Sequence, residues 1–327
     1  MRDFLDTADR LRLTRATDAL ESFSNVFSAI SELQGVFAKS YLDLDNIEAL
    51  FGAIELGVLI DKVAGRSGDA VRKLREDLVT VIYKTLEARI RFPVDETQLT
   101  ISPPKTYGDF IREIFGERYR GLRVDAAFIT FNYDVALDFA LQDVVIDYGL
   151  GEMQADAVPL LKLHGSINWG TCDTCNQIAA VPIKDAQVER ERDYGLVRIG
   201  SSLHRHTHAP CRAPLKGPPM IVPPTWNKTH DGIARVWRNA ARVLGAAENI
   251  FVIGYSLPET DAFFRYLFAL GSESDSRIKR FWVVNPDNSV AKRFEALIGR
   301  GIANRFKFIP SDFQSATQEI YTALQES

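Results

Sequence analysis

Cysteine is scarce in this sequence, long apolar runs are missing from it, and basic residues are not in excess. Its 3 cysteines among 327 residues would leave one thiol unpaired in any disulfide framework, and two of them stand in CxxC spacing. That pattern favours metal binding in a reducing compartment. No stretch approaches the ~18 uninterrupted apolar residues of a membrane-spanning helix, and the acidic N-terminus lacks the apolar region of a signal peptide. We therefore expect a cytoplasmic protein that does not enter a membrane.

The charge balance argues against one broad class of function. The 39 Lys and Arg residues are outnumbered by 43 Asp and Glu residues, for a formal net charge of -4. General nucleic-acid binders carry a basic excess, so a zinc-ribbon nucleic-acid adaptor is poorly supported, and we expect no direct nucleic-acid binding. With 46% hydrophobic and 25% charged residues, the chain is an ordinary globular protein, long enough for one large domain with insertions or for two domains.

The first 92 residues are expected to be almost wholly helical. Apolar residues recur here at three- and four-residue spacing, which is typical of a helix with one buried face. They are Phe23, Val26, Phe27, Ile30, Leu33, Val36 and Phe37. A second helix is expected to start at Asp45 or Asn46, either of which can accept the first free backbone N–H groups. A third helix runs from about Ala70 to Ile90. Prolines then mark a linker, at Pro93, Pro103 and Pro104.

Beyond this linker, short apolar runs alternate with helical patterns. The expected strands are residues 126–130, 160–163, 250–253 and 281–284, and the expected helices are residues 134–141, 260–270 and 287–298. Fully apolar strands that alternate with helices favour a parallel sheet covered by helices on both faces. The sequence therefore predicts an α/β fold.

Polar residues and glycines directly follow these predicted strands. Ligands bind beyond the carboxyl ends of the strands in such sheets. The candidate binding residues are Asn132, Asp134, His164, Gly254-Tyr255-Ser256 and Asn285-Pro286-Asp287. Each has an ordinary structural alternative: Asn132 and Asp134 are residue types that commonly cap helices, and the last two groups are common turn sequences. A strand-end Asn can also pair with another amide, such as nicotinamide, or position a water.

His164 stands in the run Lys162-Leu163-His164-Gly165-Ser166, after a predicted strand. One interpretation is a core histidine whose hydrogen bonds are satisfied. The other is a catalytic residue, because Gly165 permits close approach of backbone or ligand. An imidazole is also well suited to take a proton from a hydroxyl near neutral pH. Its place among the other strand-end residues favours catalysis.

The segment between His164 and Ile233 differs in character from the rest of the chain. It contains all three cysteines and all five histidines, a charged stretch from Lys184 to Arg198, and a proline-rich stretch from Pro214 to Pro224. Such a composition does not build a large apolar core of its own. A bound metal ion would therefore help to hold the segment together.

Four residues of this segment are candidate metal ligands: Cys172, Cys175, His208 and Cys211. Zinc prefers four thiolate or imidazole ligands, and a CxxC turn supplies two of them. His204 and His206 alternate with His208 and remain alternatives to it. A chance CxxC in a surface loop is the alternative to a metal site. Four protein ligands would make the ion structural, because catalytic zinc keeps an open position.

Taken in order along the chain, these motifs resemble the sirtuin superfamily. They are the strand-end Asn132 and Asp134, Lys162-Leu163-His164-Gly165-Ser166, the delayed CxxC pair, and Gly254-Tyr255-Ser256. The resemblance covers most of the chain from residue 120 onward and looks closest to the bacterial sirtuin-like domains of antiphage defence systems. The earlier segment Asn46-Ile47-Glu48-Ala49-Leu50-Phe51 also looks like the helical region of those proteins.

The resemblance implies a Rossmann-type NAD-binding domain with a doubly wound parallel sheet, a helical insertion and a small zinc-binding module. It implies that Asn132 and His164 carry catalysis, with Asp134 helping to orient the nicotinamide end. Ser256 would approach a ribose of NAD, and Asn285 the adenosine side. The implied cofactor-binding residues are Thr130, Phe131, Asp134, Gly254, Tyr255, Ser256, Asn285 and Asp287, and the implied metal ligands are Cys172, Cys175, His208 and Cys211.

The expected domain organisation combines these patterns with the resemblance. Residues 1–20 begin the Rossmann-type domain, 21–103 form the helical insertion, 104–168 form the core with the catalytic strand ends, 169–222 form the zinc-binding module, and 223–327 form the C-terminal half of the core.

One departure from sirtuins lies at the N-terminus. Sirtuins begin with a strand and a glycine-rich Gly-Ala-Gly-x-Ser loop that receives the pyrophosphate, and this sequence contains neither. Its opening Met1-Arg2-Asp3-Phe4-Leu5 resembles the helix directly after that loop. We therefore expect about twenty further residues upstream, because a doubly wound sheet without its first strand lacks most phosphate donors.

A second departure lies in the segment Met220-Ile221-Val222-Pro223-Pro224-Thr225-Trp226-Asn227-Lys228. Protein deacylases of this superfamily usually pair the corresponding segment with the substrate backbone as a strand. Pro223 and Pro224 remove backbone donors that such pairing would use. This argues for water as the acceptor of the cleaved group.

The expected function is therefore NAD+ hydrolysis at the nicotinamide–ribose bond, in bacterial antiphage defence, with NAD+ as substrate and zinc as a structural ion. An NAD-dependent protein deacylase and a non-catalytic NAD- or nucleotide-sensing module are the alternatives. By resemblance we also expect a homo-oligomer or a defence-system partner protein, because an enzyme that destroys NAD+ must be held inactive until needed.

Overall fold

The computed structural model describes residues 2–35, 42–95, 97, 100–115, 126–186, 188–222, 231–258, 262–271 and 277–325. The chain forms two compact units. Unit 1 comprises residues 1–101, 131–135 and 164–225, and unit 2 comprises residues 102–130, 136–163 and 226–327. The candidate residues at positions 131–134 and 164 thus belong to unit 1, although the strands that precede them belong to unit 2.

The N-terminal part of unit 1 is helical, as the apolar spacing predicts. Its helices are α1 (Arg2–Leu13), α2 (Leu20–Gly35), α3 (Ile47–Leu59) and α4 (Asp69–Arg89), and a short β1–β2 hairpin (Lys62–Val63 and Arg66–Ser67) joins the last two. In α2 the predicted face is buried at Phe23, Val26 and Ile30. Val36 and Phe37 lie outside the described residues. Asn46 caps α3, because its side-chain oxygen accepts a hydrogen bond from the backbone N–H of Glu48 at 2.9 Å.

The rest of unit 1 contains antiparallel strands that the sequence pattern did not predict. One sheet has the order β10-β11-β3-β4 and the other has the order β12-β8-β9. The strands are β3 (Arg91–Asp95), β4 (Thr100–Ile101), β8 (Trp169–Cys172), β9 (Ile178–Ala180), β10 (Val188–Arg190), β11 (Tyr194–Val197) and β12 (Leu215–Lys216), with η2 (Ile183–Asp185) and η3 (Gly200–Arg205) between them.

The linker prediction is wrong for Pro93, which lies within β3 opposite Tyr194 of β11. The pairing joins residues far apart in the chain, so no local pattern reveals it. The charged stretch after Lys184 supplies the β10–β11 hairpin that completes this sheet. The segment also buries large apolar side chains, including Trp169 and Leu196. Apolar packing therefore contributes to its stability alongside the cluster described below.

Unit 2 contains the predicted parallel strands and the helices that alternate with them. Its elements are α5 (Lys105–Phe115), β5 (Phe128–Thr130), α6 (Ala136–Ala140), β6 (Ile146–Asp147), β7 (Val158–Lys162), α7 (Asp231–Ala246), β13 (Asn249–Ile253), α8 (Ala262–Gly271), β14 (Arg280–Val284), α9 (Ser289–Glu295), η5 (Arg300–Arg305), β15 (Phe306–Ile309) and α10 (Phe313–Gln325). In the described residues the strands form two three-stranded parallel sheets, β5-β7-β6 and β13-β14-β15. The α/β prediction is confirmed.

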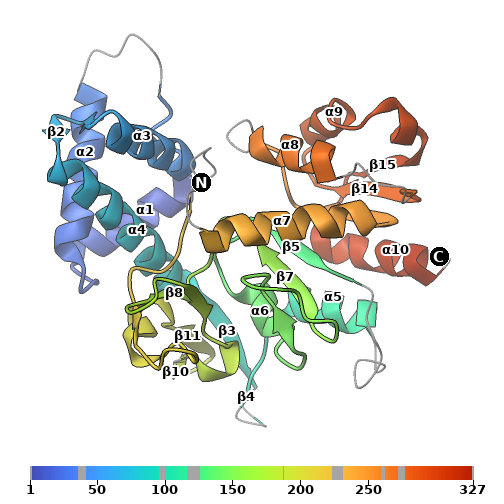
Figure 1. Cartoon of the computed structure of the whole chain (residues 1–327), viewed down its shortest axis with the longest axis horizontal. Helices are drawn as coiled ribbons and strands as arrows, with labels where there is room; N and C mark the ends of the chain where they lie inside the picture. The colour runs from blue at the N-terminus through green and yellow to red at the C-terminus, as the bar shows by residue number, and fades with distance from the viewer. Residues whose placement is uncertain are drawn as a thin grey trace. The chain divides into compact units, whose positions relative to one another are not determined.

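Helices cover both faces of the β13-β14-β15 sheet, and β14 shows why. Successive side chains of a strand point to opposite faces. Phe281 contacts Phe268 of α8 and Phe294 of α9, with ring centroids 5.2 and 6.3 Å apart. Val284 belongs to a buried cluster with Ile320 of α10. A strand buried on both faces must be apolar throughout, which is the pattern seen in the sequence. Figure 1 shows α8, α9 and α10 around these strands.

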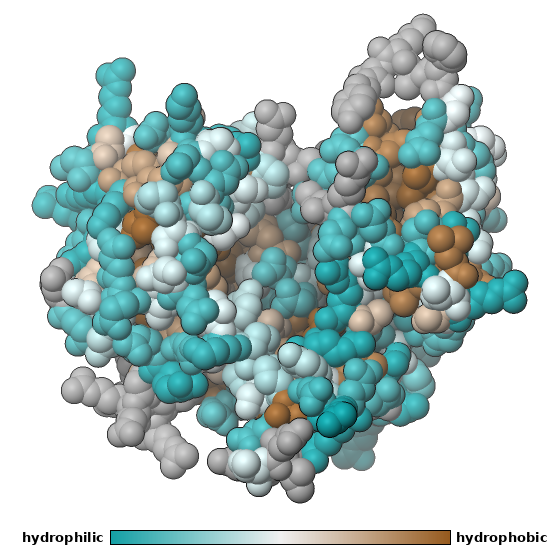
Figure 2. Space-filling view, turned by 180° about the vertical axis from the view of Figure 1, so that it is seen from behind, coloured by the Kyte–Doolittle hydropathy of each residue, from teal (hydrophilic) through white to brown (hydrophobic). Residues whose placement is uncertain are grey.

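Most of the surface seen in Figure 2 is hydrophilic, with smaller hydrophobic areas among the polar side chains. The exposed large apolar residues include Leu59 and Ile60 at the end of α3, and Tyr266 and Leu270 on α8. Among the described helices, none has the length and apolar character needed to cross a membrane.

Candidate functional site

The ends of β5 and β7 bring the predicted catalytic residues toward the same place in the fold. The two strands are parallel neighbours, and Thr130 is in register with Lys162. Asn132 and His164 each follow two residues later. The His164 ring contacts the rings on either side of Asn132, with centroids 5.1 Å away at Phe131 and 6.0 Å away at Tyr133. The segment that carries the amide therefore packs directly on the imidazole.

Backbone hydrogen bonds hold this arrangement in place within unit 1. The backbone N–H of Ile167 donates to the carbonyl oxygen of Tyr133 at 3.0 Å, which ties the two segments together. The backbone N–H of Val222 donates to the carbonyl oxygen of His164 at 2.8 Å. His164 is buried, at 2% exposed, whereas Asn132 is exposed. The site thus places a buried, positioned imidazole against the segment that carries the exposed Asn132.

The helix-cap alternative for Asn132 is weakened by the position of α6. That helix begins at Ala136, so its N-cap position falls on Val135. Asn132 lies three residues earlier, and Asp134 directly precedes the cap position. Asn132 is therefore better placed for a role at the strand end than for capping α6.

Gly165 is required by the backbone at this site. Its φ of +79° lies in the left-handed region, and a Cβ added there would stand 2.0 Å from the carbonyl oxygen of Met220. That carbonyl accepts a hydrogen bond from the backbone N–H of Ser166 at 2.9 Å. Glycine therefore permits the antiparallel bridge between Gly165 and Ile221.

Gly165→Ala is expected to lower the free energy of unfolding by about 2–4 kcal/mol, because it combines an unfavourable φ with a backbone collision. Denaturant unfolding followed by circular dichroism measures the change. Gly151→Ala is the matched control, since a Cβ at Gly151 meets nothing within 4 Å. Equal stabilities for the two variants would contradict this account of Gly165.

The second group of predicted binding residues lies in unit 2, after β13 and β14. Gly254 has a φ of +70°, and its backbone N–H donates to the carbonyl oxygen of Val284 at 2.9 Å, so the ends of these two strands adjoin. The Tyr255 ring packs edge-on against Phe264 at 5.4 Å. The carbonyl oxygen of Ser256 accepts a hydrogen bond from Arg293 at 3.0 Å. This turn is thus a well-packed strand end.

Asn285 and Asp287 use their side chains within their own turn. The side-chain oxygen of the buried Asn285 accepts a hydrogen bond from the backbone N–H of Asp287 at 2.9 Å. Asp287 in turn accepts from the backbone N–H and the hydroxyl of Ser289, which lowers the pKa of that carboxyl. The turn alternative offered by the sequence is therefore realised at both residues. Their contribution to ligand binding remains a prediction.

The structure brings together the predicted metal ligands Cys172, Cys175, His208 and Cys211. Their ligand atoms all lie within 4.8 Å of one another. The Sγ of Cys175 lies 3.4 Å from Nδ1 of His208. Four soft ligands at this separation can surround a tetrahedral zinc ion, whose bonds to sulfur and nitrogen are about 2.0–2.3 Å long. His204 and His206 do not belong to the cluster, so the fold distinguishes His208 from its two neighbours.

The electrostatics of the cluster also fit a cation. Backbone N–H groups of Cys175 and Thr174 lower the pKa of the Cys172 thiol to about 7, which favours the thiolate that metals require. Hydrogen bonding to the neighbouring Cys175 raises the pKa of Cys211 to about 11. Three thiols this close cannot all ionise unless a positive charge offsets their repulsion. The donor set therefore fits a zinc ion.

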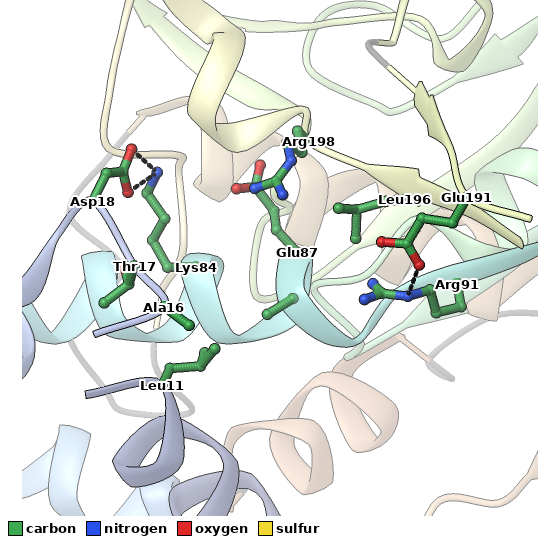
Figure 3. A pocket seen from close by; sticks show the side chains of 11 residues that line it. Leu11, Ala16, Thr17, Asp18, Lys84, Glu87, Arg91, Glu191, Leu196 and Arg198 are labelled. Atoms are coloured by element: carbon green, nitrogen blue, oxygen red, sulfur yellow. Dashed lines mark hydrogen bonds and ion pairs between the residues drawn. The ribbon is translucent and has the colours of Figure 1, made fainter. Parts of the chain in front are cut away.

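A cavity of about 430 Å³ lies in unit 1 and contains none of the predicted site residues (Figure 3). Its charged side chains pair with one another, as Lys84 does with Asp18 at 2.6 Å. Glu87 is buried there and accepts a hydrogen bond from the backbone N–H of Ser201 at 2.8 Å. Burial raises the pKa of its carboxyl. These contacts form a network of ion-pair and hydrogen-bond contacts between α4, the loop before α2 and η3.

One buried ion pair, in which a residue two positions before His164 takes part, was not predicted from the sequence. Lys162 and Asp138 are each 1% exposed, and their charged atoms lie 2.8 Å apart. A lysine within the apolar run Leu160-Leu161-Lys162-Leu163 was the available signal, because a buried charge needs a partner. No local pattern indicates which acidic residue supplies that partner.

The described residues define an α/β protein, with parallel strands in unit 2, helices and antiparallel strands in unit 1, and a Cys3His cluster. No protein-family model matches the chain, and no curated protein matches its sequence. The chain is similar to solved structures of Sir2 proteins. One, a Sir2 homologue variant in complex with ADP-ribose, is 17% identical with a TM-score of 0.40, and the match covers 78% of this chain and 77% of that chain.

Two further similar structures are a Sir2 homologue in complex with NAD and Sir2Tm bound to a propionylated peptide. The first is 16% identical with a TM-score of 0.40, covering 78% of this chain and 75% of that chain. The second is 13% identical with a TM-score of 0.39, covering 79% of this chain and 83% of that chain. At these identities and TM-scores, the function of the chain has to be inferred from its own residues.

Proposed function

We propose that this protein hydrolyses NAD+ at the nicotinamide–ribose bond, as the order of its motifs suggests by resemblance to sirtuins. The observation that carries the proposal is the buried imidazole of His164, packed against Phe131 and Tyr133 on either side of the exposed Asn132. A buried, positioned base packed on the segment that carries a strand-end amide is suited to a reaction that moves a proton in a partly dry site.

The chemistry places three demands on the protein. Breaking the nicotinamide–ribose bond develops positive, oxocarbenium-like charge on the ribose carbon. The site must therefore hold the leaving nicotinamide, shield the cation and present a nucleophile. Asn132 would hold the nicotinamide amide or position the water. His164 would accept a proton from a ribose hydroxyl or from that water, and the rings of Phe131 and Tyr133 would limit the entry of bulk water.

The backbone groups of Met220 and Val222 support water as the acceptor over an acyl-lysine peptide. Met220 donates its N–H to the carbonyl oxygen of Trp169 and accepts from Ser166, at 2.8 and 2.9 Å. Val222 donates to His164 at 2.8 Å. These groups are engaged within the chain and are not available for pairing with a substrate strand. Pro223 and Pro224, which lack backbone N–H donors, lie outside the described residues.

The Cys3His cluster completes the proposal as a structural zinc site. All four positions of a tetrahedron are supplied by protein, so no position is open for a substrate or water. The proposed role of Cys172, Cys175, His208 and Cys211 is to hold β8 and the loops before β12 together. The expected setting is a bacterial antiphage defence system in the cytoplasm, where an oligomer or a partner protein would restrain the enzyme.

The test is to incubate the natural full-length protein with NAD+, with and without an acetyl-lysine peptide, and to identify the products by chromatography and mass spectrometry. We expect nicotinamide and free ADP-ribose in both reactions. Formation of O-acyl-ADP-ribose only in the presence of peptide would instead assign deacylation. Binding of NAD+ without turnover, under conditions that include the activating partner, would assign a sensing module.

A further inference from the structure

A buried charge network in unit 2 includes a residue two positions before His164 in the chain, and it has no part in the proposed chemistry. Lys162, the last residue of β7, and Asp138, in α6, are each 1% exposed, with Nζ 2.8 Å from Oδ2. The hydroxyl of Tyr148 donates a hydrogen bond to the other carboxylate oxygen of Asp138, also at 2.8 Å. All three residues belong to unit 2.

Lys162 contacts residues both before and after Asn132 in the chain. Its backbone is in register with Thr130, two residues before Asn132, and the backbone N–H of Leu163 donates to the carbonyl oxygen of Thr130 at 2.9 Å. Its side chain holds Asp138, six residues after Asn132. His164 follows Lys162 by two residues. A single side chain thus links the two segments that carry the proposed amide and base.

Stability alone is a poor explanation for this ion pair. Removing two charges from water carries a large desolvation penalty, and apolar replacements of similar size are often as stable as the pair or more so. The charged atoms of an ion pair meet at a short distance and in a defined direction, which apolar packing does not require. The pair therefore holds the distance between the two segments within a narrower range than apolar packing would. Catalysis is sensitive to such separations, because a displacement of about 1 Å can reduce a rate about a hundredfold.

We infer that Asp138 and Lys162 are positioning residues, which set the relative placement of Asn132 and His164 for the reaction. The inference rests on the proposed function for its kinetic test, but the geometry it describes is independent of that function. Tyr148 supports the pair by holding the second carboxylate oxygen of Asp138.

The experiment is a double-substitution cycle with Asp138→Asn, Lys162→Met and the two combined. Each single variant removes one of the two buried, opposite charges of the pair and is expected to be less stable than the natural protein. The combined variant removes both charges of the pair, so its thermal midpoint should return to near the natural value. Its kcat for NAD+ hydrolysis should remain about 10- to 100-fold low, with KM changed less than about threefold.

Recovery of stability without recovery of kcat is the outcome that a purely structural pair would not produce. Ile320→Ala, in α10 of the same unit, is the control for lowered stability, and its kcat should be unchanged at a temperature where it is folded. If the combined variant does not fold, Tyr148→Phe provides a milder test, with an expected fall in kcat of about threefold at constant KM. Natural kcat in a folded combined variant, or in Tyr148→Phe, would overturn the inference.

A spectroscopic measurement separates this inference from the proposed function. The imidazole signals of His164, assigned by comparison with His164→Gln in nitrogen–proton NMR spectra, should shift in the combined variant and stay unchanged in Ile320→Ala. If the natural protein does not cleave NAD+, the proposed function fails, and the NMR comparison alone decides the positioning role. Unchanged His164 signals in a combined variant would refute that role, whether or not the protein cleaves NAD+.

Discussion

His164→Ala is expected to reduce the kcat for NAD+ hydrolysis by about 10²–10⁴-fold, the range that a positioned general base contributes. The reason is that the imidazole is a titratable group packed on the Asn132 segment, where it is buried in contact with the rings of Phe131 and Tyr133. Removing it leaves the substrate hydroxyl or the attacking water without a proton acceptor. Initial rates of nicotinamide release, measured at saturating NAD+, give the change.

Two further variants test whether a loss of activity comes from losing the base or from losing a buried side chain. His164→Gln keeps most of the volume and a polar end, so it should fold like the natural protein and still lack activity. His204→Ala removes an exposed imidazole outside the metal cluster and should be fully active. Near-natural turnover by a folded His164→Ala protein would remove His164 from the mechanism and leave Asn132 as the remaining candidate.

Cys172→Ser is expected to abolish stoichiometric zinc binding and to lower the free energy of unfolding by more than about 3 kcal/mol. Cys172 is a buried residue at the end of β8, and its thiolate is favoured by backbone N–H groups of the CxxC turn. A serine hydroxyl does not replace a thiolate as a zinc ligand, and the remaining thiols would then repel one another when ionised. Metal content by mass spectrometry and unfolding in denaturant measure the two effects.

The matched control is His206→Ala, which removes a neighbouring histidine that does not belong to the cluster. It should retain zinc and the stability of the natural protein. A strong chelator should reproduce the effect of Cys172→Ser on the natural protein and have little further effect on the serine variant. Natural protein prepared without chelators that contains no stoichiometric zinc would refute the structural-zinc proposal.

The α/β part of the fold was predictable because its signals are local. In unit 2 the predicted strands β5, β7, β13 and β14 are short, largely apolar runs, and α6, α8 and α9 fall in the predicted helical stretches. The helices of unit 1 were predictable for the same reason, down to the cap at Asn46. The strand β3 was not predictable from local patterns. Its partner β11 comes from a distant part of the chain, and the pairing places Pro93 in a sheet.

At the candidate site, too, local sequence patterns predicted some features and only the fold decided others. The spacing of Cys172 and Cys175 suggested a metal site with His208 as the fourth ligand, and His204 and His206 remained alternatives until the fold placed His208 within 3.4 Å of a thiol. Asn285 and Asp287 follow a strand as predicted, and the structure shows that both side chains also serve their own turn. The sequence indicates where chemistry can occur, and it does not show which polar groups are already engaged.

The sequence by itself determined the residue types, the order of the motifs and the periodicity of apolar side chains. This periodicity is a local signal, because it depends on residues only a few positions apart. Three arrangements were decided only by tertiary structure: the packing of His164 on the Asn132 segment, the choice of His208, and the pairing of Lys162 with Asp138. Each depends on contacts between residues distant in the chain. Such contacts are selected by the packing of the whole unit and not by any local pattern.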